Sequence, residues 1–274
     1  MRAARLFCIA SAATPLLAAI PALAQPLLVP HRAVYDIVLA DATERSGITG
    51  INGRMVYEFN GSPCEGYTVS FRFVTRIETA EVSRVTDQQT TTYEDAEGKT
   101  FNFVTKSYVD QTLDREIRGK ATRQKNKTMV ELDEPEETDV QLAATQFPTQ
   151  HLYELISKAE AGETFYETTL YDGSDEADEV MTTSVVIGKE REPMPGDAEF
   201  PTARTIKPET FWPVSIAYFD QVEESGEVVP DYRINFKLHE NGITRDLTMD
   251  YGDFSMKGKL VDLAIFQDAE ACKK

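Results

Sequence analysis

The sequence has few of the residues on which enzyme chemistry most often depends. Among 274 residues there are three histidines, three cysteines and one tryptophan. His31, His151 and His239 lie far apart, and no segment matches a phosphate-binding loop, a dinucleotide-binding fingerprint, a serine-nucleophile turn or a zinc-protease helix. A zinc site needs three or four nitrogen or sulfur ligands, which these residues do not supply. We therefore predict no catalytic, cofactor or metal site and expect that the protein is not an enzyme.

Basic residues and long apolar segments are scarce as well. Lysine and arginine number 28 against 46 aspartates and glutamates, which gives a net charge of −18 at pH 7. Such a surface repels the phosphate backbone of nucleic acids and does not favour adsorption to anionic lipid. After residue 24 no stretch approaches the roughly 20 apolar residues of a membrane-spanning helix. We expect no nucleic-acid partner and no membrane span.

The first residues have the order of an export signal. Two arginines precede an apolar stretch over residues 6–20, and Ala22 and Ala24 are the small residues expected before a cleavage site. This order is typical of a secretory signal peptide. We predict that residues 1–24 are a signal peptide and that residues 25–274 form a single domain in the periplasm.

Removal of that leader would leave two cysteines, Cys64 and Cys272. In an oxidising compartment, two cysteines most simply form one disulfide. The loop-entropy model puts the effect of closing so long a loop at roughly 5 kcal/mol as an upper estimate. Free thiols or a redox pair are the alternative, which the lack of a Cys-x-x-Cys spacing does not favour. We predict that the disulfide holds the C-terminal tail.

Alternation of apolar and polar residues is the dominant pattern in the rest of the chain. It is clearest at residues 67–73 and 232–238, and similar runs occur at 32–40, 54–59, 82–93, 100–109, 164–171, 180–187, 214–218, 244–251 and 254–266. Period-two alternation indicates strands with one buried face. Asn241-Gly242 is a strong hairpin signal. So many strands joined by short turns predict a mainly β fold, in which a large antiparallel sheet curls into an open or spiral β-barrel, or forms a sandwich.

One segment has helical spacing instead. Leu152, Leu155, Ile156 and Ala159 make one apolar face over residues 150–159, with Thr149 as the expected cap and a glycine soon after as the expected stop. The sequence thus predicts one or two short helices, and an amphipathic helix in a β domain typically plugs a barrel mouth or covers a sheet edge. The acidic stretches 131–137 and 172–179 are predicted to be solvated loops.

Three residues are candidates for a binding face: Trp212, His151 and Tyr218. Trp212 is the only tryptophan and is followed by Pro213, which limits ladder pairing and indicates a strand start or an edge. A core anchor is the simpler interpretation of such an aromatic residue, and a binding-face aromatic is the alternative.

The order of these segments resembles the family of cell envelope integrity protein EipB, found in the periplasm of Gram-negative bacteria. The resemblance rests on the ordered set of residues 29–35, 53–67, 147–151, 171–174, 212–219 and 240–247. It implies a β-spiral or open barrel loosely like outer-membrane lipoprotein carriers, a disulfide between an early loop and the C-terminus, a role in envelope integrity, a periplasmic tetratricopeptide-repeat protein as partner, and no catalytic residues. Residues 190–206 match nothing in that pattern.

Three hypotheses follow for the function. The leading one is a non-enzymatic periplasmic protein that maintains envelope integrity by binding a protein or another envelope component. The second is a carrier of lipid or lipoprotein, which requires a continuous apolar cavity in the barrel. The third is a hydrolase with two facing carboxylates, because 46 acidic residues supply many candidates.

Overall fold

A computed structural model describes residues 27–173, 179–219 and 229–266. The predicted signal peptide and Cys272 lie outside these residues, so export and the disulfide stay predictions. Cys64 lies in the turn between β2 and β3, where its side chain is exposed.

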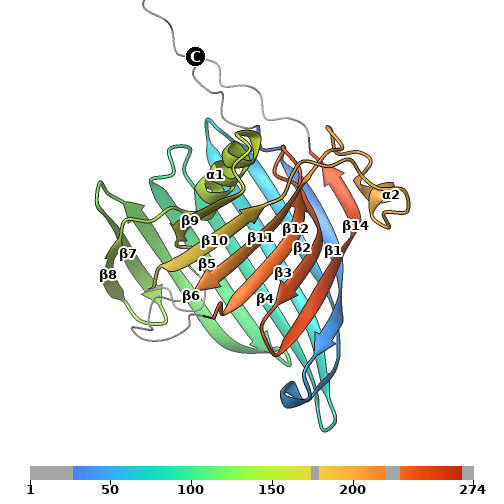
Figure 1. The fold of residues 1–274 in the computed structure, drawn as a ribbon. Coiled ribbons are helices and arrows are strands. Elements are labelled where there is room, and N and C mark those ends of the chain that lie inside the picture. Colours follow the sequence, from blue (N-terminus) through green and yellow to red (C-terminus); the bar gives the residue numbers. More distant parts are fainter. Residues whose placement is uncertain (1–26, 174–178, 220–228, 267–274) are drawn as a thin grey trace, which may run out of the picture.

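One antiparallel sheet of fourteen strands makes up most of the described part of the chain (Figure 1). The strands are β1 (His31–Ala42), β2 (Ile48–Ser62), β3 (Gly66–Thr79), β4 (Ser83–Glu94), β5 (Thr100–Val109), β6 (Thr112–Arg123), β7 (Lys127–Glu134), β8 (Thr138–Ala143), β9 (Phe165–Leu170), β10 (Met181–Ile187), β11 (Trp212–Phe219), β12 (Tyr232–Leu238), β13 (Thr244–Asp250) and β14 (Phe254–Ile265). The helices are the 3₁₀ turn η1 (Glu44–Ser46), α1 (Pro148–Glu160) and the single-turn α2 (Phe200–Ala203).

The sheet consists of two meanders joined at β1 and β14. Strands β1 to β8 follow one another outward in one direction, and β14 to β9 follow one another in the other. The edge strands β8 and β9 are not paired with each other in the sheet. A short parallel bridge links Gln146 to Leu170 at the end of β9, and the Tyr171 N–H donates to the Gln146 carbonyl at 3.0 Å. Figure 1 shows the sheet curling round into an open barrel. The predicted open barrel is confirmed, and the sandwich alternative is not adopted.

Strands β6, β7 and β8 were not predicted from the pattern. In β6 the inward positions include Gly119 and Ala121, which are too small to mark an apolar face, and β7 and β8 are short strands with only eight and six residues. The prediction of a loop over residues 131–137 is therefore wrong for its first half, because β7 continues to Glu134 and the turn follows it.

Helix α1 is two residues longer at its start than predicted. Its N-cap position is Phe147, which makes no side-chain cap, and Thr149 lies inside the first turn. Thr149 is therefore not the cap. Instead, the Glu94 carboxylate at the end of β4 accepts the N–H groups of Thr149 (2.7 Å) and Gln150 (3.2 Å). A buried carboxylate on another element satisfies the free amides that every helix start leaves.

Candidate binding site: the inner wall of the barrel

The barrel has two ends that differ in how they are filled. The helix end contains α1, and the far end is the opposite one, where β1 turns into β2 and β13 turns into β14 (Figure 1). At the helix end the inward side chains and the apolar face of α1 form one buried cluster. It comprises Leu28, Phe59, Tyr67, Tyr153, Leu155, Ile156, Ala159, Tyr166, Val185, Ile187, Trp212, Val214, Ile216 and Leu238.

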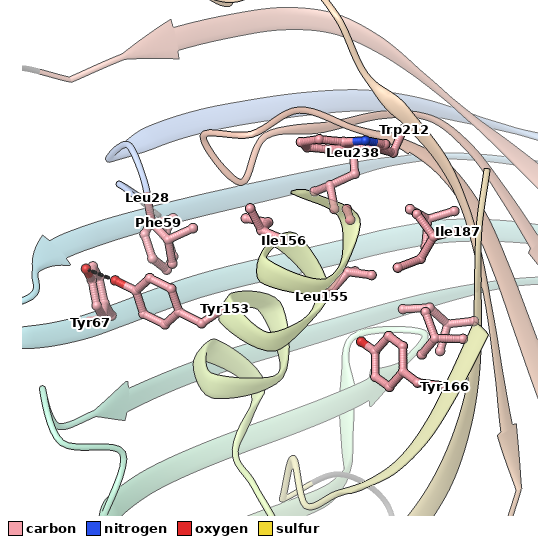
Figure 2. Close-up of a cluster of buried hydrophobic side chains, with 14 residues drawn as sticks. Leu28, Phe59, Tyr67, Tyr153, Leu155, Ile156, Tyr166, Ile187, Trp212 and Leu238 are labelled. Carbon is pink, nitrogen blue, oxygen red and sulfur yellow. Dashed lines mark hydrogen bonds between the residues drawn. The ribbon is translucent and has the colours of Figure 1, made fainter. Parts of the chain in front are cut away.

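Figure 2 shows how α1 lies within this cluster. Ile156 is fully buried, and Leu155 points toward the β10 side of the barrel near Ile187. On the other side the Tyr153 hydroxyl forms a short hydrogen bond with that of Tyr67, across a ring contact of 6.1 Å. The helix therefore packs as part of the core and fills this end of the barrel.

Glu94 ties α1 to the sheet, and its environment is unusual for a carboxylate. Its side chain is only 2% exposed. Burial raises the pKa of Glu94 to about 7, and the hydrogen bonds from the two helix amides oppose that rise. The protonation of this residue thus changes in the neutral range.

Two of the three predicted binding-face residues lie at the helix end. Trp212 is 7% exposed and belongs to the cluster around α1. His151, on α1, is buried with its Nε2 atom 3.5 Å from the Thr183 hydroxyl, and burial lowers the pKa of His151 to about 4. Both residues contribute to the packed core, and a role in ligand binding stays a prediction for them.

Tyr218, the third predicted residue, lies at the margin of the cluster around α1 and begins a series of aromatic rings that runs toward the far end. Successive ring centroids are 5.5 Å apart between Tyr218 and Tyr232, 4.8 Å between Tyr232 and Tyr251, and 5.0 Å between Tyr251 and Phe254. These four residues, from β11 to β14, are the aromatic ladder. Each of them remains half-buried or exposed.

Beyond the helix the inner wall has both apolar and polar parts. Phe71, Phe73, Ile234 and Phe236 are half-buried and pack at the margin of a second buried cluster, whose members include Ile37, Ile51, Met249 and Met256. Next to Phe71 and Phe73, on β3 to β5, threonine hydroxyls pair across the strands, at 2.6 Å for Thr75 and Thr86 and 3.1 Å for Thr90 and Thr105. The inner wall is therefore amphipathic, with partly exposed aromatic residues beside hydroxyl groups.

No helix of the described residues has the length and apolar character needed to cross a membrane. In the same part of the chain, no three histidine, cysteine, aspartate or glutamate side chains gather as metal ligands would.

The chain is similar to known proteins over most of its length. The model of the EipB-like family matches residues 22–267. A relative named cell envelope integrity protein EipB, from Brucella abortus (strain 2308), is 58% identical over 240 residues, covering 87% of this chain and 85% of the relative. A crystal structure described as a beta-barrel-like protein with a domain of unknown function, also from Brucella abortus, is 57% identical with a TM-score of 0.85, covering 88% of this chain and 99% of that one.

Proposed function

The chain belongs to the EipB-like family, and on that premise we propose that it maintains the integrity of the cell envelope from the periplasm, as a binding protein and not as an enzyme. The name of the Brucella relative supports the envelope role. The family resemblance noted from the sequence supports a periplasmic tetratricopeptide-repeat protein as one partner.

The observation that carries the proposal is the contrast along the inner wall. At the helix end, α1 already occupies the space that the sheet encloses. Toward the far end, aromatic side chains such as Tyr218, Tyr232 and Phe254 face inward and stay partly exposed. Tyrosine side chains combine an apolar ring with a polar hydroxyl, and therefore suit an amphipathic ligand. We assign ligand binding to this part of the wall.

A second candidate function, the carriage of lipid or lipoprotein, is favoured by the amphipathic character of the same wall. An acyl chain would lie on the side of Phe71, Phe73 and Ile234, and a polar headgroup would face the threonines of β4 and β5. The two candidates differ in what fills the barrel: an acyl chain for a carrier, and a segment of another envelope molecule for the leading function.

The carboxylates that a hydrolase would use have structural contacts here. Glu94 accepts the first amides of α1, Glu199 accepts the Leu260 N–H at 2.5 Å, and Asp197 pairs with Arg245 at 2.7 Å. These contacts favour structural roles for the buried acids, and they support a binding function over hydrolysis.

The proposal is tested by complementation of a deletion strain. Y218S/Y232S removes two rings of the ladder and should fail to restore resistance to detergents, whereas the wild-type gene restores it. Y108S on β5, which changes a half-buried tyrosine away from the ladder, is the control and should complement fully. Full complementation by Y218S/Y232S, or a deletion strain with unchanged detergent sensitivity, would refute the proposed function.

A further inference from the structure

The outer surface of the barrel carries a cavity that the proposed function does not use. Residues 188–211, between β10 and β11, pass over the outer face of β11 to β14 and contain α2. Between this segment, here named the strap, and the sheet lies a cavity of about 840 Å³. Its size falls within the range of ligand-binding pockets. This is the outer groove.

A buried ion pair holds the strap in place. Arg245 is fully buried and donates through Nη1 to Asp197 Oδ2 at 2.7 Å and through Nε to His239 Nε2 at 3.1 Å. Its guanidinium lies 5.0 Å from the centre of the Phe211 ring. Loss of the carboxylate would leave a buried guanidinium unpaired, which lowers the stability of the fold. The ion pair between Arg245 and Asp197 therefore holds the strap against the sheet.

The floor of the outer groove is one row of cross-strand partners. Val186, Ser215, Asn235, Thr248 and Lys257 are successive neighbours on β10 to β14. Their strands are paired on both sides, so a ligand cannot join the sheet through its backbone and must be recognised by side chains. With about 4.8 Å between strands, the row is about 19 Å long, which is the length of about six extended residues.

The same row continues into a second cavity. Lys257 is the partner of Val38 on β1, followed by Asn52 on β2 and Arg76 on β3. These last three residues line a cavity of about 590 Å³ on the outer face. The two cavities therefore follow one direction across the strands and suit an extended ligand better than a compact one.

The lining of the outer groove carries four basic and four acidic side chains, whereas acidic residues predominate in the chain as a whole. Lys257, Lys259 and Arg191 line the outer groove and have no ion-pair partner among the residues that the structure describes. The lysine that is neutralised is Lys237, which pairs with Asp197 at 3.0 Å and with Asp246 at 2.9 Å. These contacts occupy two of the four carboxylates on the lining, and Glu199 accepts the Leu260 N–H. The charged groups left to meet a ligand are therefore the three cations and Glu192.

Apolar side chains are interspersed with these cations. Val186 is 52% exposed, Val38 is 50% exposed, and Met194 on the strap is 75% exposed. A ligand that matches these side chains would carry both acidic and apolar groups, which a sugar chain does not.

We propose that the outer groove binds an extended segment of a protein partner that carries both acidic and apolar residues, with its carboxylates on Lys257 and Lys259. This site lies on the face opposite the inner wall, so it can be present whether or not the far end binds a ligand.

The test uses a fluorescein-labelled peptide of about twelve residues, in which glutamate alternates with valine or leucine, and fluorescence anisotropy with the full mature protein. Wild-type protein should bind it at least tenfold more tightly than a peptide with lysine in place of glutamate, and affinity should fall as salt rises. K257Q/K259Q should weaken binding at least fivefold. The matched control K120Q/K125Q removes two exposed lysines outside the groove and should bind like wild type.

Glutamine is chosen because Lys259 lies opposite Asp36 in the sheet, where a glutamate would add repulsion. Equal affinity for the two peptides, or equal binding by wild type and K257Q/K259Q, would overturn the proposal. Binding of phosphatidylglycerol vesicles that is lost in the same variant, without peptide binding, would assign the groove to lipid instead. Complementation by K257Q/K259Q and Y218S/Y232S separates the two sites, because each variant changes one face of the sheet.

Discussion

The two ends of this barrel are built from the same strands but have different physical characters. At the helix end, α1 brings Leu155 and Ile156 into contact with inward residues from both meanders, and the inner wall becomes a packed core. At the far end the same alternation continues, yet residues such as Tyr232 and Phe254 face inward without being fully covered. Helix α1 therefore packs one end of a continuous wall, while the far end combines a second buried cluster, with Met249 and Met256, and aromatic residues that stay partly exposed.

The predicted disulfide should have the largest effect on stability, because Cys64 lies at the helix end and the bond would tie the C-terminal tail there. Cys64→Ser should lower the free energy of unfolding by a few kcal/mol, up to roughly 5 kcal/mol in the loop-entropy model. Urea denaturation with and without reductant measures the difference. Identical curves for wild type under both conditions would show that no stabilising bond is formed.

The contrast between the two ends predicts unequal costs for the same substitution. Ile156→Ala at the fully buried helix end should lower the free energy of unfolding by about 3–4 kcal/mol, because it leaves a cavity in a packed core. Ile234→Ala, at a half-buried position toward the far end, should cost about 1–2 kcal/mol. Thermal and urea denaturation of the pair compare them directly. Equal costs would mean that the two ends are packed alike.

Glu94 predicts a pH dependence specific to the helix end. Its folded pKa of about 7 lies above its ordinary value, so the folded state binds the proton more tightly, and this contribution is full at low pH and lost as pH rises through 7. The free energy of unfolding of wild type relative to E94Q should therefore increase by about 2–3 kcal/mol between pH 8 and pH 5.

The comparison with E94Q is needed because the three histidines act in the opposite direction. Burial lowers the pKa of His31, and lowers the pKa of His151 and His239 to about 4, so each contributes stability that is lost as pH falls below the ordinary histidine value. These residues are unchanged in E94Q, so their effect cancels in the difference. A difference that does not vary with pH would show that Glu94 is not held as a buried, partly protonated cap.

The sequence predicted the open barrel and most of its strands because half-buried strands alternate visibly. It did not predict β6, since Gly119 and Ala121 are too small to mark its apolar face, nor the short strands β7 and β8. It placed the cap of α1 at Thr149 because the true partner, Glu94, is distant in the sequence. The outer groove was not foreseen for a related reason. The strap has no periodicity, and only the folded chain shows that Arg245 is buried against Asp197.

Of the candidate binding residues, the sequence could suggest aromatic side chains but not where they lie. Trp212 and Tyr218 belong to the same strand, β11, and both contact the cluster around α1, but Trp212 is buried within it and Tyr218 is half-buried at its margin. Their difference in exposure depends on where α1 lies, and α1 follows β8 in the chain. The sequence around Trp212 and Tyr218 carries no information about that position.

Titration with the apolar fluorophore N-phenyl-1-naphthylamine tests most directly whether the far end is the part of the wall that binds. Its fluorescence should rise on addition to wild-type protein and stay near background with Y218S/Y232S, while the emission of Trp212 keeps its buried character in both. Equal enhancement by the two proteins, or none with wild type, would contradict the assignment.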